Sequence, residues 1–129
     1  MTKLTLATGM IAAMLASGAM AQDCTTPGDA KVGVIEIVQF RLAAGASRTD
    51  FLAAAAATMP VLCATEGFIG RTLSEGEDGA WTDHVKWTSP DLAQAAMAGS
   101  MENEALLPFI MAIDPDSMSL SYQTPVDLN

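Results

Sequence analysis

Most side chains that could do chemistry fall in one short segment, AWTDHVKWT at residues 80–88. Its β-branched and aromatic residues predict a strand, whose side chains alternate between the two faces of a sheet. Asp83 then shares a face with Trp81 and Trp87, and a carboxylate between aromatic side chains is a candidate general base. The alternative is that strand twist lets Asp83 reach solvent or a backbone donor.

His84 is the only histidine in the chain, and it points to the face opposite Asp83. An imidazole can carry protons near neutral pH, so His84 is the second catalytic candidate. The alternative is a hydrogen-bonded polar group, for example at a subunit interface. One histidine without clustered carboxylates does not make a metal site, and no phosphate loop or dinucleotide fingerprint is present. We therefore expect no metal and no cofactor.

Glu36 interrupts an otherwise apolar run, VGVIEIVQF at residues 32–40. A buried carboxylate needs a partner, and Arg71 or Lys86 on neighbouring predicted strands would supply one. Two interpretations remain open. The carboxylate either forms an internal ion pair that fixes strand register, or it binds substrate together with Arg71 and Trp87.

Four strands are expected to position these residues, at residues 31–42, 68–75, 80–88 and 117–123. Helical patterns separate the first strand from the second and the third from the fourth. The order β-α-β-β-α-β is the ferredoxin-like or split βαβ arrangement. The fold class is therefore α+β, a four-stranded antiparallel sheet with helices on one face.

The first helix is expected to begin at the N-cap Ser47, with Asp50 three residues later, and to stop near Gly67. Pro60 should kink or divide it, because proline lacks the N–H that a helix interior uses. Ser89 should cap a second helix. The inner face of that helix is predicted to carry Leu92, Ala95, Ala96 and Gly99.

The first strand is apolar on both faces, because Ile35 and Ile37 lie opposite Val34 and Val38. The helices can cover only one of these faces. The other would leave an apolar patch exposed in a monomer. We therefore expect a homodimer in which this face meets a second subunit.

Residues 1–21 have the pattern of a cleavable signal peptide. Lys3 precedes a short apolar run, and Ala19 and Ala21 give the A-x-A spacing of a cleavage site. The apolar run is too short for a comfortable membrane span. We expect export to the periplasm or medium, a short extension at residues 22–30 and one domain at residues 31–129, with no membrane attachment after cleavage.

The mature chain keeps 15 acidic residues, while Lys3, one of the 6 basic residues, leaves with the leader. Such an acidic balance argues against nucleic acid and against an anionic membrane surface. The chain has two cysteines, and export favours a disulfide between Cys24 and Cys63. The alternative is a buried free Cys63 and an exposed Cys24.

The segments VGVIEIVQFRL, SRTDFLAAAAATMPVL, GFIGRTL, DGAWTDHVKW and PFIMAIDPDSMSL together resemble the antibiotic biosynthesis monooxygenase (ABM)-like group. The resemblance covers roughly residues 32–124. It implies a dimeric α+β barrel, and it implies that Trp87 lines a pocket between sheet and helices. An amide is expected at position 83, where this chain has a carboxylate. Members of this superfamily include cofactor-free oxygenases, haem-degrading enzymes and proteins without a known reaction.

Two functions follow as expectations. The first is a small-molecule-binding protein that carries out cofactor-independent oxidation or isomerisation of a small aromatic or quinone-like compound. The alternative is a non-catalytic periplasmic binding or scaffold homodimer. An enzyme needs space beside Trp87, so the first function fails if Phe40, Phe51 and Phe109 fill that space.

Overall fold

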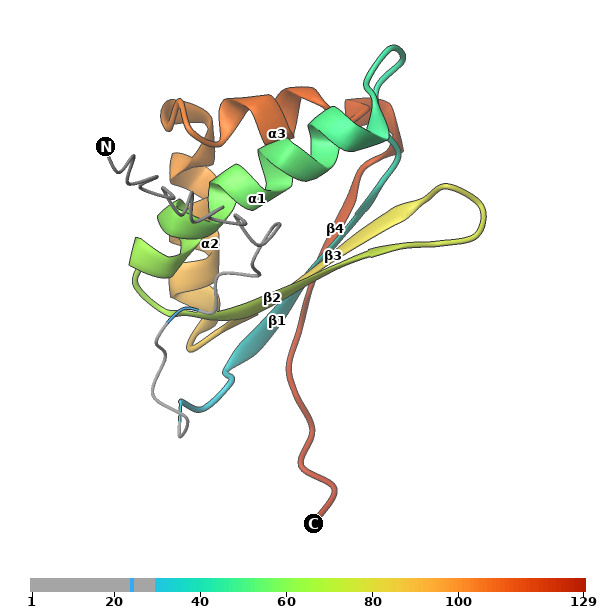
Figure 1. The fold of residues 1–129 in the computed structure, drawn as a ribbon. Coiled ribbons are helices and arrows are strands. Elements are labelled where there is room, and N and C mark those ends of the chain that lie inside the picture. Colours follow the sequence, from blue (N-terminus) through green and yellow to red (C-terminus); the bar gives the residue numbers. More distant parts are fainter. Residues whose placement is uncertain (1–23, 25–29) are drawn as a thin grey trace, which may run out of the picture.

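A computed structural model describes Cys24 and residues 30–129. The signal peptide, its cleavage site and most of the extension lie outside the described residues. The chain forms a four-stranded antiparallel sheet of order β2-β3-β1-β4, with the helices on one face (Figure 1). The predicted ferredoxin-like α+β class is confirmed.

The strand bounds follow the predicted strands closely. They are β1 Val34–Phe40, β2 Phe68–Glu75, β3 Trp81–Trp87 and β4 Ser119–Gln123. The fourth strand begins later than expected, because residues Pro115–Ser117 form a 3₁₀ turn capped by the Asp114 side chain.

The helix α1 spans Arg48–Ala64, and its N-cap is Ser47 as predicted. The Asp50 N–H donates to the Ser47 hydroxyl at 3.0 Å. Pro60 lies inside the helix and does not divide it, so the first of the two expected effects, a kink, stays a prediction and the second is wrong. Pro60 and Ala56, four residues earlier, are both exposed, so the Ala56 carbonyl that proline leaves unbonded can be hydrated.

Helix α2 spans Pro90–Gly99, and the short helix α3 spans Leu107–Met111. The predicted inner face of α2 is partly wrong, since Ala95 and Gly99 are exposed while Ala93 is fully buried. The first turn after Ser89 packs on the sheet, so the buried stripe runs through Ala93, Ala96 and Met97.

The buried core consists of two clusters on the inner face of the sheet. One contains Val34, Phe68, Val85, Trp87 and Ala93. The other contains Val38, Phe40, Phe51 and Trp81. Buried charged residues on β1 and β3, Glu36 and Asp83, belong to neither cluster.

The outer face of the sheet has no helix over it (Figure 1). Ile35 and Ile37 are half-buried there, and the strand register places them beside Lys86 and His84 of β3. The other side chains on this face are mostly Thr, Ser and Gln. The predicted apolar patch is therefore limited to two isoleucines in a polar surrounding.

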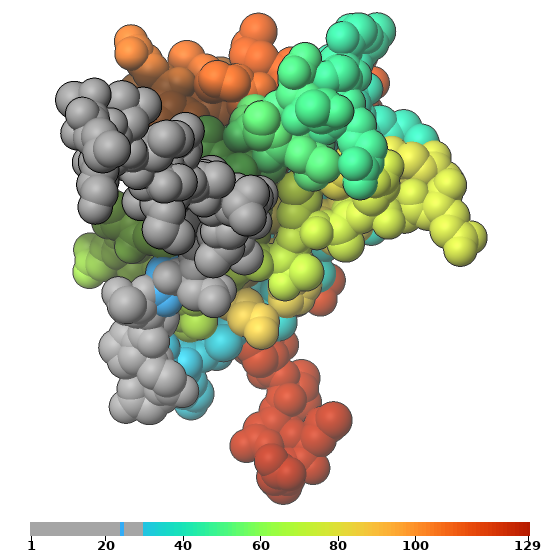
Figure 2. Space-filling model, in the orientation of Figure 1, coloured from blue at the N-terminus to red at the C-terminus, as the bar shows by residue number. Residues whose placement is uncertain are grey.

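The C-terminal residues beyond β4 continue away from the body of the molecule (Figure 2). Val126 and Leu128 in this tail are both exposed. Among the described residues, none of the helices is both long enough and apolar enough to span a bilayer.

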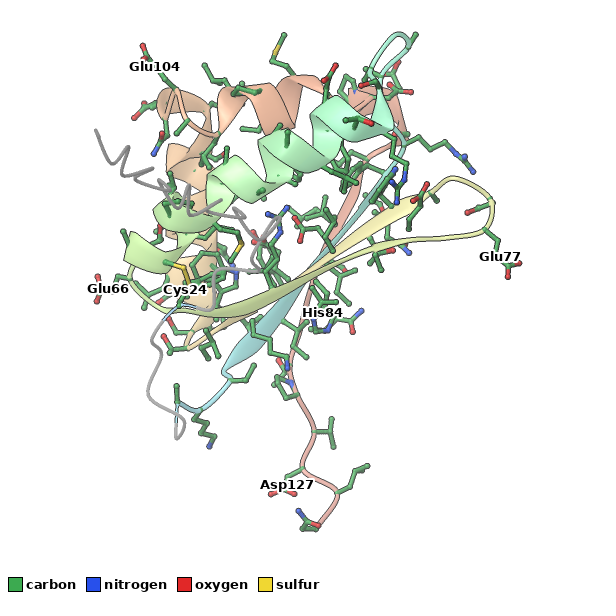
Figure 3. All side chains as sticks on the ribbon, in the orientation of Figure 1. Cys24, Glu66, Glu77, His84, Glu104 and Asp127 are labelled. Atoms are coloured by element: carbon green, nitrogen blue, oxygen red, sulfur yellow. A yellow bond between two sulfur atoms is a disulfide. The ribbon has the colours of Figure 1, made fainter. Side chains whose placement is uncertain are left out.

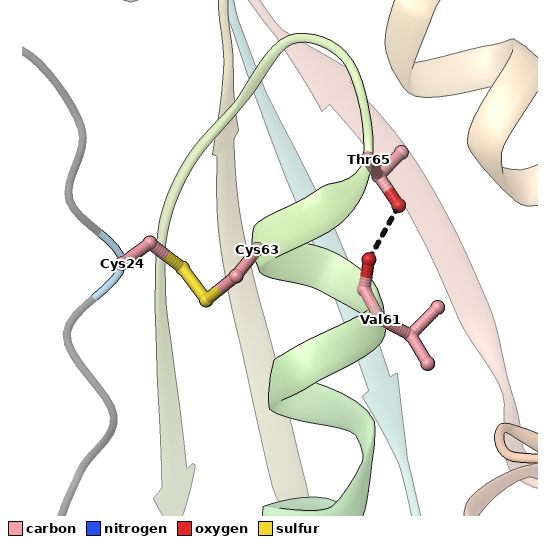
Figure 4. Close-up of a disulfide and its surroundings, with 4 residues drawn as sticks. All are labelled: Cys24, Val61, Cys63 and Thr65. Atoms are coloured by element: carbon pink, nitrogen blue, oxygen red, sulfur yellow. Dashed lines mark hydrogen bonds between the residues drawn. A yellow bond between two sulfur atoms is a disulfide. The ribbon is translucent and has the colours of Figure 1, made fainter.

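The predicted disulfide is present. Cys24 is bonded to Cys63 near the end of α1, with their Cα atoms 5.3 Å apart (Figure 4). The same helix end is held by Thr65, whose hydroxyl donates to the Val61 carbonyl at 2.8 Å. The bond therefore ties the segment before β1 to the C-terminal turn of α1.

Removing this bond should destabilise the domain. A loop of about 40 residues corresponds to roughly 4 kcal/mol in the chain-entropy model. The double variant Cys24→Ser/Cys63→Ser should therefore lose 2–4 kcal/mol of unfolding free energy, estimated from the same principle and measured by urea denaturation of the mature chain. Reducing the wild type should give the same loss, whereas a loss below about 1 kcal/mol would contradict the prediction.

Candidate functional site

A cavity of about 460 Å³ lies between the inner face of the sheet and the helices. Its walls come from β1, β2, β3, α1, α2 and α3, and from the 3₁₀ turns at Ser100–Glu102 and Pro115–Ser117. Most of the lining is apolar. The lining includes Glu36, Val38, Phe40, Thr58, Arg71, Asp83, Val85, Trp87, Ala96, Met97, Met101, Phe109 and Met118.

Aromatic side chains form one end of this cavity without filling it. Phe51 packs against Phe40 with ring centroids 5.7 Å apart and stacks on Phe109 at 5.3 Å. Phe51 also meets Trp81 at 4.8 Å. Phe40 and Phe109 thus form a wall, and the space beside Trp87 stays open. The condition that would have excluded an enzyme is not met.

The most strongly connected charges at the site are Arg71 and Asp83. Arg71 Nε donates to one Asp83 oxygen at 2.8 Å, and Nη2 donates to the other at 2.7 Å. The two side chains are only 5% and 9% exposed. This two-pronged geometry is the strongest form of a guanidinium–carboxylate pair, and it occupies both oxygens of the predicted general base.

The remaining guanidinium nitrogen of Arg71 reaches α1. Nη1 donates to the Thr58 hydroxyl at 2.7 Å and to the Ala55 carbonyl at 3.3 Å. The Thr58 hydroxyl in turn donates to the same carbonyl at 2.6 Å. Arg71 also lies against the Phe109 ring, with Cζ 4.8 Å from its centroid. One arginine therefore fixes β3, α1 and α3 relative to β2.

No cation of the described residues lies beside Glu36, which corrects the expected ion pair. In the register, Val85 of β3 stands between Glu36 of β1 and Arg71 of β2, so the two charges are separated by two strand spacings of about 4.8 Å each. Lys86 points to the outer face. Arg71 instead pairs with Asp83 on the adjacent strand.

The Glu36 carboxyl is consequently an unusual group. The residue is 6% exposed, and its Oε2 atom is buried without a hydrogen-bond partner. Burial raises the pKa of Glu36 to about 7, and the negative charge of Asp83 adds to the rise, while the hydroxyl of Tyr122 on β4 opposes it. Glu36 can therefore exchange a proton near neutral pH.

Trp87 provides a second unpaired polar atom at the same cavity. Its indole Nε1 is buried and has no hydrogen-bond acceptor among the described residues. Proteins rarely leave buried donors or acceptors unpaired. An acceptor-bearing ligand or ordered water at this point would satisfy the indole N–H.

The other predicted catalytic residue, His84, lies outside the cavity. It is on the sheet face opposite the helices (Figure 3), where the register pairs it with Ile37 and Thr72. The sequence did place it on that face. The predicted substrate-binding residues Glu36, Arg71 and Trp87 all line the cavity.

Two residues at the site were missed from the sequence. Thr58 looked like part of an alanine-rich helix, although it is the polar member of the buried stripe with Phe51 and Ala55. Its spacing of seven residues from Phe51 and three from Ala55 was a usable signal. In the sequence, Tyr122 is one of the alternating apolar residues of the fourth strand. Only the pairing of β4 with β1 brings it opposite Glu36.

A second hollow, of about 510 Å³, lies between α1 and the edge strand β2. Its charged residues are paired, Arg48 with Glu75 and Arg71 with Asp83. Cys24 and residues 30–129 contain no group of three or more His, Cys, Asp or Glu side chains that could hold a metal ion. The cavity beside Trp87 is therefore the candidate site.

By sequence, the chain matches no protein-family model and no curated protein. Solved structures are similar in fold. A Bordetella bronchiseptica protein named for the antibiotic biosynthesis monooxygenases is 18% identical, with a TM-score of 0.63 over 74% of this chain and 99% of the other. SnoaB, a cofactor-independent oxygenase from Streptomyces nogalater, is 18% identical, with a TM-score of 0.54 over 77% and 96%.

A monooxygenase from the gene ActVA-Orf6 of Streptomyces coelicolor, solved in complex with Nanaomycin D, is also similar. It is 20% identical, with a TM-score of 0.56 over 76% of this chain and 91% of the other. At these identities the likeness shows the fold, which is ABM-like as the sequence resemblance implied.

Breaking the buried ion pair from one side should destabilise the fold strongly. Arg71→Met leaves Asp83 buried near Glu36 without a cation, and such a change costs about 3–5 kcal/mol of unfolding free energy. The double variant Arg71→Met/Asp83→Leu should recover most of that loss. Urea denaturation of both variants measures the difference.

The matched control is the exposed pair Arg48–Glu75, joined at 2.8 Å. Arg48→Met should cost below about 1 kcal/mol. Equal losses for Arg71→Met and Arg48→Met would show that the buried pair does not stabilise the domain.

Proposed function

We propose that this protein binds a small, flat aromatic or quinone-like compound in the cavity beside Trp87. The observation that supports this best is an apolar cavity of about 460 Å³ lined by Glu36 and Trp87, each of which has a buried polar atom, Oε2 and Nε1, without a partner among the described residues. Small-molecule sites commonly combine such a volume and apolar lining with a few polar groups that orient the ligand.

The side chains of the wall suit a flat aromatic ligand. Trp87, Phe40 and Phe109 offer ring faces and edges, with which another ring makes stacked or edge-on contacts. Three methionines, Met97, Met101 and Met118, complete the lining. Their flexible thioethers adapt to irregular apolar shapes, so the site can accept more than one ring system.

The reaction that we propose is oxidation or isomerisation without a bound cofactor. SnoaB and the Streptomyces coelicolor monooxygenase share this fold, although a shared fold does not fix a reaction. Asp83, the base expected from the sequence, has both oxygens bonded to Arg71. In this chain Asp83 therefore holds the wall of the cavity, and Glu36 and Trp87 are the polar groups that can meet a ligand.

Binding without turnover is the second candidate. The pairing of Asp83 with Arg71 favours it, because the pairing removes one carboxylate from acid–base work. His84 also lies on the opposite face of the sheet from the cavity, so it cannot contact a ligand bound there. Oxygen uptake by the protein loaded with a hydroquinone distinguishes oxidation from binding, since a binding protein leaves the uncatalysed rate unchanged, and analysis of the recovered ligand detects isomerisation.

We place the protein in the periplasm or the medium, and we propose that it is a homodimer. The predicted leader at residues 1–21 supports export, and the Cys24–Cys63 disulfide suits an oxidising compartment. Ile35 and Ile37 on the helix-free sheet face supply an apolar centre for a subunit contact with a polar rim.

Sedimentation of the mature chain at low micromolar concentration should give twice the monomer mass. Ile37→Glu should yield monomers, because a two-fold contact would bring two buried carboxylates together. Gln39→Glu, an exposed position on the same face of β1, is the control and should leave the dimer intact. A monomeric wild type would refute the dimer.

Filling the cavity should abolish ligand binding. Ala96 lines the cavity, whereas Ala98, two residues later on α2, is exposed. With 1,4-naphthoquinone as the probe in calorimetric titration, Ala96→Phe should bind at least about tenfold more weakly than wild type, since losing a few apolar contacts costs this much. Ala98→Phe should bind like wild type.

Thermal unfolding of both variants checks that each one folds. Mass spectrometry of the protein recovered from exporting cells adds two readouts: a bound small molecule, and a mature chain beginning at Gln22. Tight binding that Ala96→Phe leaves unchanged would place the ligand elsewhere and overturn the proposed site.

A further inference from the structure

The cavity contains one carboxyl group that is free to exchange a proton with a bound molecule. Glu36 lines the cavity and is 6% exposed, and its Oε2 atom is buried with no hydrogen-bond partner among the described residues. The other carboxylate of the wall, Asp83, has both oxygens bonded to Arg71. Of the two carboxylates, only Glu36 can accept a proton from a ligand without breaking an ion pair.

A donor sits at the same cavity. Trp87 Nε1–H is buried and also lacks a partner. In the register Val34 faces Trp87 and Glu36 faces Val85, so Glu36 and Trp87 are diagonal neighbours on one sheet face, with Cβ atoms somewhat less than about 7–8 Å apart. One acceptor and one donor at this separation can contact oxygen atoms of the same small ring system.

We propose that Glu36 is the proton acceptor of this site, and that its ligand is a hydroxylated aromatic compound. The ring hydroxyl meets Glu36 Oε2, and a ligand oxygen accepts a hydrogen bond from Trp87 Nε1. In the proton-transfer step the ligand O–H bond breaks and an O–H bond forms on the Glu36 carboxylate. The products are a phenolate and a neutral Glu36, so charge and atoms balance without a further reactant.

This inference rests on the proposed aromatic-binding function and assigns the group that selects among aromatic ligands. The raised pKa of Glu36, about 7, allows both protonation states near neutral pH. Three charged or titratable groups face it. They are Asp83 on β3, Arg71 on β2, which is ion-paired with Asp83, and the Tyr122 hydroxyl on β4. The helices that cover the cavity add no titratable side chain to its lining.

The sign of the pH dependence follows from these charges. Above pH 7 Glu36 is a carboxylate, and a hydrogen bond from a ligand hydroxyl to a charged acceptor is stronger than one to a neutral group. Below pH 7 Glu36 is protonated and the bond is weaker. A neutral phenol should therefore bind more tightly as pH rises through 7, while an ether of the same shape should show no such change.

The test compares 2-naphthol with 2-methoxynaphthalene, which lacks the proton. Calorimetric titrations of the mature, disulfide-bonded protein would cover pH 5.5 to 8.5. Wild type should bind 2-naphthol about tenfold more tightly at pH 8.5 than at pH 5.5, because a charge-assisted hydrogen bond replaces a neutral one. Glu36→Gln, which keeps the shape of the side chain, should bind 2-naphthol weakly at every pH and bind 2-methoxynaphthalene as wild type does.

Trp87→Phe is the second variant, and it should weaken both probes severalfold at all pH values, because both carry an oxygen that accepts the indole N–H. If 2-naphthol shows the same pH profile with wild type and with Glu36→Gln, the role of Glu36 is overturned. The binding function still stands in that case if Ala96→Phe weakens the binding of both probes. Failure of either probe to bind wild type, together with failure of 1,4-naphthoquinone, would overturn both.

Discussion

The buried bond between Arg71 and Asp83 is the constraint on which the rest of the structure depends. Burying both charges carries a large desolvation cost, which is offset only when geometry is good and the remaining donors are satisfied. The two parallel hydrogen bonds to Asp83, together with those to Thr58 and the Ala55 carbonyl, meet that requirement. The pair sits where the two apolar clusters part, so the domain is stabilised at its centre by a polar connection. Because all three guanidinium nitrogens of Arg71 are hydrogen-bonded to these groups, none is left for Glu36. The cavity is therefore lined by a carboxyl group that has no cation among the described residues.

The sequence predicted those features that depend on local periodicity and turn chemistry. The alternation of β3 placed Asp83 and Trp87 on one face and His84 on the other, and Ser47 and Ser89 marked the helix starts. It could not decide which carboxylate Arg71 would bind, because that depends on β3 lying between β2 and β1. Tyr122 was missed for the same reason, since its role comes from a strand pairing distant in sequence. The buried face of α2 was predicted incorrectly, because a helix rich in alanine has no strong contrast between an apolar and a polar face.

The same sheet serves two different purposes on its two faces. The inner face supplies the cavity wall, and every second residue of β1 and β3 on that side is buried. The outer face is polar apart from Ile35 and Ile37. Since side chains alternate strictly along a strand, a register slip of one residue would exchange these faces and place Glu36 in the solvent. The β1–β3 pairing thus sets both the fold and the position of the Glu36 carboxyl at the cavity.

The tail beyond β4 has a practical consequence. Residues 124–129 extend from the sheet on the side away from the helices (Figures 1 and 2), and they contribute nothing to the cavity lining. A surface tether or fluorescent label attached at Asn129 would therefore stand clear of the cavity lining. Immobilised protein should thus retain an accessible cavity, which suits surface-based screening of compound collections.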